Sequence, residues 1–264
     1  MPEAIELLHA EVLDHHEVAP DHWVITLDAP EIAAGARPGQ FVMVRGIQGT
    51  DPLLPRALSI YHADVEGGCI ELLYRVVGPG TTRLQEHEPG RRVAVWGPLG
   101  SQFRLPEGDR VVLVGGGVGV PPLVFWAERL AALSVPMEVI ALIGAQSESS
   151  LVGIDRLRRA RANVRIATDD GSQGRKGYVT DLLPQAVQSA RATIYACGPT
   201  PMLKAVARLG KTLETPTELA LEAPMACGVG ACLGCTVPRR EGGFARVCTE
   251  GPVFDRDSID WETL

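Results

Sequence analysis

The first hundred residues consist of short apolar runs separated by turns. Gly and Pro signals punctuate them, for example at Pro38-Gly39 and Pro89-Gly90, and one brief helical stretch falls at 81–87. Several short strands joined by tight turns are typical of an antiparallel β barrel. The runs rich in β-branched residues, which we expect to be strands, are 5–13, 22–27, 41–44, 57–62, 69–77 and 92–95.

From Arg110 onwards the pattern changes to apolar runs that alternate with helical stretches. This alternation predicts a parallel, doubly wound α/β sheet. The expected strands are 111–114, 139–143, 164–167, 193–196 and 217–221, and the expected helices are 121–133, 151–160, 179–189 and 200–209.

Length and charge narrow the class of protein. A chain of 264 residues with 45% hydrophobic residues can form two domains of ordinary size and a small appendage. The net charge of −7, without any basic run, argues against nucleic-acid binding. The start of the chain is acidic and lacks the apolar core of a signal peptide. The longest uncharged apolar run, 111–127, contains four glycines and Pro121-Pro122, which makes it a poor membrane span. Six cysteines fit a reducing compartment, so we expect a cytoplasmic protein.

The cysteines carry the most specific chemical signal. They follow a Cys-x4-Cys-x2-Cys pattern at Cys227, Cys232 and Cys235, with a fourth at Cys248, and this is the plant-type ligand spacing of a 2Fe–2S cluster. Three glycines between the ligands (Gly228, Gly230 and Gly234) are expected to let the backbone curl and turn its amides towards the cluster. A tail this small needs the metal for its folding energy. Cys69 and Cys197 remain outside the motif.

Two alternatives compete with the iron–sulfur interpretation. A structural zinc site also uses four cysteines, but it usually pairs two short Cys-x2–4-Cys motifs, whereas the second half here is Cys248 alone. Disulfides require an oxidising compartment, and nothing in the chain suggests secretion.

Two loops at the carboxyl ends of predicted strands are candidates for nucleotide binding. Gly115-Gly-Gly-Val-Gly119 lies between a strand and a helix, where phosphates bind, but Val120 occupies the last glycine position of the usual dinucleotide fingerprint. No carboxylate ends the strand 139–143, so this test leaves dinucleotide binding undecided. Asp169 and Asp170 follow a later strand, and would repel the 2′-phosphate of NADP.

The barrel half contains two further candidate stretches. Arg56 and Ser59 at the start of a strand could hold phosphate and ring atoms, although an Arg at a strand edge is usually only solvated. Gly80 and Thr81 at a helix start could offer N–H groups and a hydroxyl to a pyrophosphate, or Thr81 could simply cap the helix.

Taken together, these motifs resemble the ferredoxin–NADP reductase superfamily and, within it, the electron-transfer subunits of bacterial type 1B dihydroorotate dehydrogenase. The resemblance covers nearly the whole chain. The cysteine motif and the tail Val247 to Phe254 are its most specific parts. One departure is Ala57, which stands where the family's Arg-Pro-x-Ser flavin motif has Pro. The positions that the resemblance implies for FAD are Arg56, Ala57, Leu58, Ser59, Leu73, Tyr74, Arg75, Gly80 and Thr81, and those for the nicotinamide nucleotide are Gly116, Gly117, Gly119, Cys197, Gly198 and Pro199.

The resemblance also implies a function. Electrons from dihydroorotate would pass from FMN in a separate catalytic subunit through this chain's 2Fe–2S cluster and FAD to NAD, within a heterotetramer of two plus two subunits. A cluster carries one electron, a flavin one or two, and a nicotinamide two as hydride, so no side chain is needed as a nucleophile or general base. We therefore expect no catalytic side chain here.

Three domains follow from this interpretation: a FAD-binding barrel at 1–103, an NAD-binding α/β domain at 104–216 and a 2Fe–2S module at 217–264. Two alternatives remain open. One is another FAD and 2Fe–2S NAD(P) reductase subunit, linked to a hydrogenase or a ferredoxin. The other is a non-catalytic binding module stabilised by zinc. Met225, Ala226, Val229 and Leu233 around the ligands could form a partner interface or could simply pack around the cluster.

Overall fold

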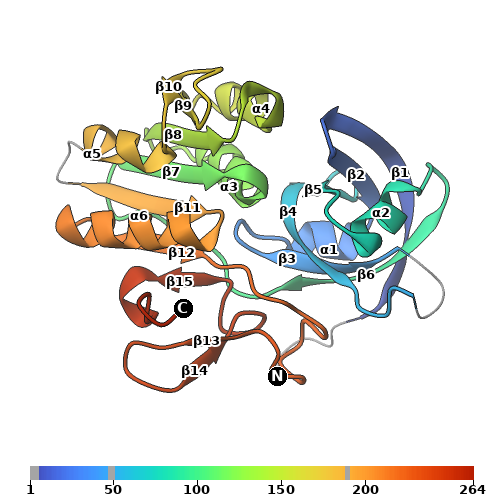
Figure 1. Cartoon of the computed structure of the whole chain (residues 1–264). Coiled ribbons are helices and arrows are strands. Elements are labelled where there is room, and N and C mark those ends of the chain that lie inside the picture. Colours follow the sequence, from blue (N-terminus) through green and yellow to red (C-terminus); the bar gives the residue numbers. More distant parts are fainter. Residues whose placement is uncertain (1–5, 47–50, 188–190) are drawn as a thin grey trace.

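The computed structural model describes residues 6–46, 51–187 and 191–264. It contains two lobes and a C-terminal module that lies below both of them in Figure 1. The elements of the first lobe are β1 (Leu8–Ala19), β2 (His22–Asp28), α1 (Pro30–Gly35), β3 (Phe41–Arg45), β4 (Arg56–Asp64), β5 (Cys69–Arg75), α2 (Pro79–Gln85) and β6 (Arg92–Leu99).

The first lobe is the antiparallel barrel that the sequence predicts. Its strands close in the order β1-β2-β5-β4-β3-β6. β1 is longer than the predicted 5–13, because its polar second half pairs with β2 as far as Ala19 opposite His22. Helix α1 was not predicted; it buries Ile32 and Ala33 in the barrel core, and its Pro30 and small residues resemble a turn in the sequence.

The second lobe is the predicted doubly wound sheet. Its strands lie in the order β10-β9-β8-β7-β11-β12-β15, and all neighbours are parallel except β12 and β15. The strands are β7 (Arg110–Gly116), β8 (Glu138–Ala145), β9 (Asn163–Thr168), β10 (Arg175–Lys176), β11 (Ala192–Cys197), β12 (Thr217–Ala220) and β15 (Val253–Asp255). The order reverses between β7 and β11, where ligands bind in such sheets.

The helices of this lobe cover both faces of the sheet. Val111 and Leu113 of β7 belong to the core beneath α3 (Val120–Ala131) and α4 (Ile154–Arg159). Val112 and Val114 face the opposite core, with α5 (Leu183–Ala186) and α6 (Thr200–Thr212). Figure 1 shows α6 packed along β11 and β12.

Two predicted helices are shorter than expected. The helix expected at 151–160 begins only at Ile154, because Gly153 adopts a left-handed conformation with φ 75°. The helix expected at 179–189 is a 3₁₀ turn at Val179–Leu182 followed by one α-helical turn, and 188–190 lie outside the described residues. Pro184 lies in that α-helical turn. Because proline has no backbone N–H, it cannot donate a hydrogen bond to the preceding turn.

The C-terminal module contains the hairpin β13 (Thr236–Pro238) and β14 (Phe244–Arg246) and contributes β15 to the large sheet. Its Cys235, Val247 and Phe254 share one core with Leu203 of α6 and Met43 of the barrel, so the three parts of the chain are packed together. We expected the C-terminal module to begin at residue 217, and β12 begins there. β12 nevertheless pairs with β11 of the second lobe, so a domain boundary between residues 216 and 217 stays a proposal. Within the described ranges, no helix is long and apolar enough to cross a membrane.

Candidate cofactor sites

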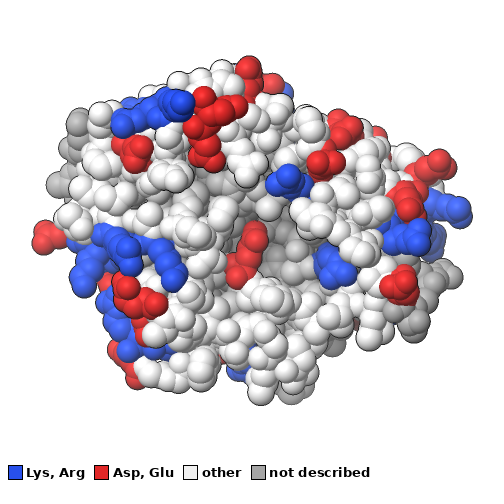
Figure 2. Space-filling model, viewed as in Figure 1, with Lys and Arg blue, Asp and Glu red and all other residues white. Residues whose placement is uncertain are grey.

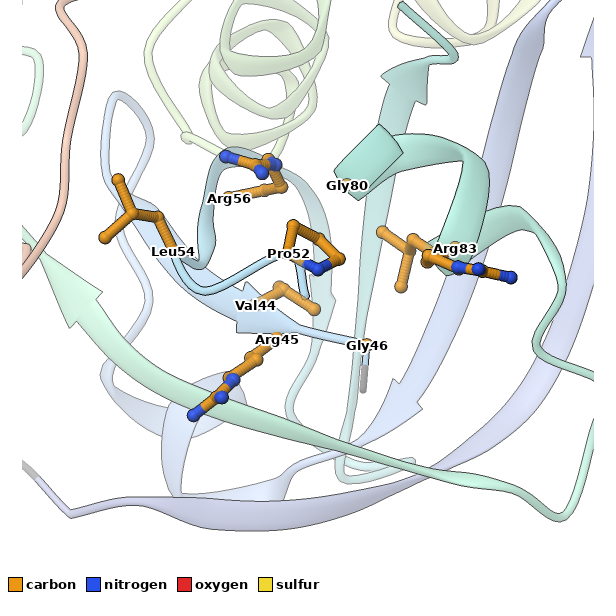
Figure 3. A pocket seen from close by; sticks show the side chains of 9 residues that line it. Val44, Arg45, Gly46, Pro52, Leu54, Arg56, Gly80 and Arg83 are labelled. Carbon is orange, nitrogen blue, oxygen red and sulfur yellow. The ribbon is translucent and has the colours of Figure 1, made fainter. Parts of the chain in front are cut away.

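The predicted flavin residues Arg56 and Gly80 are brought together between β4 and α2. The Arg56 guanidinium lies beside Gly80, where a Cβ atom on that glycine would collide with it (Figure 3). Both residues line the same pocket, with Val44 and Pro52 beside them (Figure 3). A guanidinium held beside a helix start fits the anionic groups of FAD.

The hydroxyl of Thr81 is used within the chain. It accepts hydrogen bonds from the N–H groups of Val77 (2.9 Å) and Gly78 (3.2 Å) and donates to the carbonyl of Gly78 (3.0 Å). The structure therefore shows the second alternative, in which the Thr81 side chain caps the start of its own helix. Any contact of Thr81 with a pyrophosphate would come from its backbone.

Strand β5 places its three predicted residues in three different surroundings. Leu73 is buried against the second lobe, in the core shared with α3. Tyr74 points into the barrel, where its hydroxyl lies 2.8 Å from His15 Nε2, and burial raises its pKa. Arg75 is exposed and lines the cleft between the lobes. On β4, Ala57 is exposed, whereas Leu58 and Ser59 are half-buried.

A cleft of about 660 Å³ opens between the two lobes, at the carboxyl ends of the parallel strands. Figure 2 shows the hollow, with an isolated acidic side chain inside it. The predicted nucleotide residues Gly116, Gly117, Gly119, Gly198 and Pro199 all line this cleft.

Close packing explains the glycines. A Cβ atom on Gly119 would overlap the backbone carbonyl of Cys197, and one on Gly116 would lie 2.7 Å from Met202 Sδ. The turn after β7 can thus approach the end of β11 only because these two positions are glycine. The thiol of Cys197 itself is 2% exposed and lies beneath the cleft, and burial raises its pKa well above the ordinary value.

Sequence reasoning missed several residues of this cleft. Glu222 lies in it two residues after β12, exposed at the cleft surface, and partial desolvation there raises its pKa. The exposed Tyr178 and Gln146 also line it. These side chains come from separate loops, and no local sequence motif indicates that the loops meet at one cleft. Of the two predicted acids, Asp169 lines the cleft, whereas Asp170 accepts hydrogen bonds from the N–H and hydroxyl of Ser172.

The four predicted ligand cysteines lie in the C-terminal module as two pairs. The N–H of Cys232 points at Cys227 Sγ (3.5 Å), and the N–H of Cys248 at Cys235 Sγ (3.5 Å). The Cys248 thiol also senses the charge of Cys227, which links the two pairs. In the part of the chain that the structure describes, no three His, Cys, Asp or Glu side chains gather closely enough for one metal ion. Two pairs of thiols fit a cluster that divides its four ligands between two irons.

The pKa values of two of the ligand cysteines, Cys227 and Cys248, are shifted in opposite directions. Burial alone would raise the pKa of Cys227, but N–H donors from Cys232 and Val229 outweigh it and lower that pKa to about 6. Burial and the Cys235 thiol raise the pKa of Cys248 to about 11. Backbone amides aimed at the Cys227 sulfur favour its thiolate form, which is the form that binds metal. All six cysteines lie within the described residues and none forms a disulfide.

The glycines of the cysteine loop behave differently from one another. Gly228 and Gly230 have φ of 72° and 78°, as expected for a backbone that curls around a cluster, but Gly234 is not in that conformation. The N–H of Gly234 points at Cys232 Sγ (3.5 Å), and a Cβ atom there would make only an ordinary contact with that sulfur.

The cysteine loop packs on the barrel strands next to the flavin motif. A Cβ atom on Gly228 would lie 2.6 Å from Met43 Cγ, and the Trp96 ring N–H donates to the carbonyl of Cys227 (3.3 Å). Met43 is fully buried and lies opposite Ala57 in the β3–β4 ladder. Met43 therefore contacts the cysteine loop with its side chain and pairs through its backbone with the strand that begins with Arg56.

The residues expected to surround the ligands divide into two groups. Met225 is half-buried and packs against the shared core, as ordinary packing predicts. Val229 and Leu233 are 41% and 58% exposed, and Leu233 has a φ of 58°. In Figure 2, the lower middle of the visible face, over the part of the C-terminal module nearest the barrel, carries few charges.

Comparisons with known proteins agree with this division of the chain. Residues 9–103 match the family model of an oxidoreductase FAD-binding domain, and residues 113–208 that of an oxidoreductase NAD-binding domain. Residues 222–260 match the iron–sulfur cluster binding domain of dihydroorotate dehydrogenase B. FAD, an iron–sulfur cluster and NAD are thus the cofactors of these regions.

Similar proteins span almost the full chain. The dihydroorotate dehydrogenase B (NAD⁺) electron transfer subunit of Desulforamulus reducens is 41% identical over 262 residues, which cover 97% of this chain and 99% of that protein. The corresponding subunit of Bacillus caldolyticus is 40% identical, over 90% and 92%. Among solved structures, a chain of an NADH-dependent reduced ferredoxin–NADP oxidoreductase has a TM-score of 0.87 at 27% identity, over 100% and 93% of the two chains. The cytochrome b5 reductase domain of Ulva prolifera nitrate reductase (TM-score 0.67, 19% identity, 81% and 94% coverage) shares the fold.

Proposed function

Because the chain belongs to the family of dihydroorotate dehydrogenase B electron transfer subunits, we propose that it conveys electrons from an FMN-containing catalytic subunit, which oxidises dihydroorotate, to NAD. The cluster supplies one-electron transfer, the flavin exchanges one or two electrons, and the nicotinamide takes up hydride. The partner stoichiometry that we propose is two plus two. The unpaired cysteines fit the cytoplasm as the compartment.

The observation that carries this proposal is the position of Met43. Its side chain packs against Gly228 of the cysteine loop on one side, and its backbone pairs opposite Ala57 of the flavin strand on the other. The cleft lined by Arg75 and Gly116 opens beside the same barrel. The proposed cluster site, flavin site and nucleotide cleft are thus neighbours around one barrel, which supports electron transfer in that order.

The residues that we propose for each cofactor are those that the sequence motifs and the family resemblance imply. Cys227, Cys232, Cys235 and Cys248 hold the 2Fe–2S cluster. For FAD we propose Arg56, Ala57, Leu58, Ser59, Leu73, Tyr74, Arg75, Gly80 and Thr81. Gly116, Gly117, Gly119, Gly198 and Pro199 form the bed of the nucleotide, with Cys197 contributing only backbone. Asp169 is placed to favour NAD over NADP, because its carboxylate lines the cleft and would repel a 2′-phosphate.

The experiment combines the purified chain with its partner. The chain alone should oxidise NADH with artificial acceptors but should not reduce NAD⁺ with dihydroorotate, and adding the FMN subunit should restore that reaction. Cys248→Ser should abolish the coupled reaction and lower the iron and sulfide content while FAD stays bound. Turnover of dihydroorotate by the chain alone, or an unchanged iron content in Cys248→Ser, would refute the proposal. Cys69→Ser, at a half-buried cysteine outside the motif, is the matched control.

The alternative of a hydrogenase- or ferredoxin-linked reductase subunit has one observation in its favour. The solved structure that covers the whole chain at a TM-score of 0.87 belongs to an NADH-dependent ferredoxin–NADP oxidoreductase. Copurification distinguishes the two functions, because it identifies the subunit that binds this chain.

A further inference from the structure

Five polar or aromatic side chains, none of them among the predicted cofactor residues, join the barrel to the nucleotide-binding lobe. Two lie on the second lobe, Glu128 on α3 and Arg156 on α4, and three lie on the barrel, Tyr61 and His62 on β4 and Glu71 on β5. We refer to these five residues as the interlobe cluster.

Arg156 is the centre of the interlobe cluster. Its Nε donates to Glu128 Oε1 at 2.8 Å, and its Nη1 forms an ion pair with Glu71 across the lobe boundary. Its guanidinium carbon lies 4.5 Å from the centre of the Tyr61 ring. One planar side chain therefore makes three contacts, two of them to the other lobe, and a flexible ammonium group could not reproduce that fork.

A second connection runs in parallel with the first. His62 Nδ1 lies 2.6 Å from Glu128 Oε2, so that one carboxylate is bound from both lobes. The side chains are shielded from solvent, with exposed fractions of 17% for Arg156, 23% for Glu128 and 28% for Glu71. Shielded contacts in which one guanidinium binds two carboxylates are geometrically specific, unlike exposed surface pairs.

The elements that carry the interlobe cluster also carry the proposed cofactor residues. β4 begins with Arg56 and continues to His62, and β5 leads from Glu71 to Arg75. α3 begins directly after Gly119 of the nucleotide turn and reaches Glu128.

α4 is held against the start of α3 at Gly153. A Cβ atom there would lie 2.8 Å from Val120 Cγ1 and 3.0 Å from Val124 Cγ2. The contacts of Arg156 on α4 therefore act directly on the helix that presents the nucleotide turn.

We propose that the interlobe cluster is a positioning device: Arg156 and Glu128 set the distance and angle between the flavin strands and the nucleotide turn, and so align the nicotinamide with the flavin for hydride transfer. Hydride transfer depends steeply on alignment, and a displacement of about 1 Å can cost about 100-fold in rate. The inference rests on the cofactor sites proposed above. None of the five side chains is assigned to cofactor or substrate.

The test replaces Arg156 with Met, which keeps the length and apolar stem but removes the fork. Arg156→Met should retain FAD and iron, and should show a hydride transfer rate from NADH to flavin that is lower by about 10- to 100-fold, with a larger deuterium isotope effect. The nicotinamide–flavin charge-transfer absorbance should weaken as well. Arg156→Lys should recover only part of the rate, because an ammonium group cannot bind both carboxylates at once.

The control is Arg158→Met, on the same helix α4, where Arg158 forms only an exposed pair with Asp155. It should leave the rate and the isotope effect unchanged. If Arg156→Met does not fold, Glu71→Gln removes only the barrel side of the contact and should produce the same signature.

A flavin-replete variant with unchanged rate, isotope effect and charge-transfer absorbance would overturn the inference. So would a loss of rate explained entirely by lost FAD. Failure of the proposed flavin site is a separate result, seen as full FAD retention in Arg56→Ala, and it does not alter this readout.

Discussion

At the scale of single residues, Gly80 shows how a missing side chain makes room for a neighbouring one. The Arg56 guanidinium occupies the space that a Cβ atom on Gly80 would take. We expect Gly80→Ala to displace that guanidinium and to weaken FAD binding by about tenfold, the loss of one charge-assisted hydrogen bond. Flavin content and the Kd of FAD measure it. Gly78→Ala is the control, because nothing lies within 4 Å of its added methyl group. Equal FAD affinity in the two variants would contradict this use of Gly80.

The carboxylate of Glu128 gives a prediction for pH. Burial alone would raise its pKa, but His62 and Arg156 outweigh it and hold the pKa below the usual 4.5. A depressed pKa stabilises the folded state above the unfolded-state pKa, and that contribution is lost as pH falls through the folded value. Glu128→Gln should therefore lower the free energy of unfolding at pH 7 by about 1–3 kcal/mol. The difference from wild type should shrink below about pH 4.5.

Thermal unfolding at pH 7 and at pH 4 measures this effect. Glu86→Gln is the matched control, since Glu86 forms only an exposed pair with Arg83, and its change should stay within about 0.5 kcal/mol. A Glu128→Gln variant equally destabilised at both pH values would show that packing, and not the charge, is responsible.

At the scale of elements, the cysteine loop is shaped by its contact with the barrel. Gly228 combines a φ of 72° with a close approach to Met43 and Leu99, whereas Gly242 has a φ of 91° and open space around it. Alanine at either site carries a left-handed strain of about 1–2 kcal/mol. Only Gly228→Ala should also push the loop away from β3, lowering iron content and slowing electron transfer from cluster to flavin.

Iron analysis and rapid-mixing absorbance separate the two effects. If Gly242→Ala lost iron to the same extent, strain alone would explain the loss, and the contact with Met43 would have no special role.

At the scale of the whole molecule, the exposed apolar residues beside the cluster mark the face that we expect to meet the FMN subunit. Leu233 is 58% exposed next to Cys232, and Val229 is 41% exposed. Leu233→Asp should weaken association with the partner by about tenfold or more, because a charge in an interface core loses its hydration. NADH oxidation with artificial acceptors should persist.

Val135→Asp is the control for this prediction, since Val135 is 61% exposed on the lobe that carries the nucleotide cleft and lies outside the cluster module. Size-exclusion or calorimetric titration with the FMN subunit gives the Kd. Undiminished association of Leu233→Asp would place the interface elsewhere.

The sequence by itself determined whatever depends on local pattern. The strand and helix periods predicted the barrel and the doubly wound sheet, and the cysteine spacing predicted the iron–sulfur cluster, because side chains two, three or four residues apart obey the geometry of one element. Local signals failed where they were ambiguous, as at α1, whose Pro30 and small residues resemble a turn, and at the helix expected over 179–189.

Only the tertiary structure decided how distant segments combine. It placed Glu222 and Tyr178 in the nucleotide cleft, buried the thiol of Cys197 beneath it, and put Met43 between the cysteine loop and the flavin strand. It also joined Arg156 to Glu71 across 85 residues of chain. Such contacts depend on the docking of two lobes and a module through shared cores, and docking geometry is a property of complementary surfaces that no local period encodes.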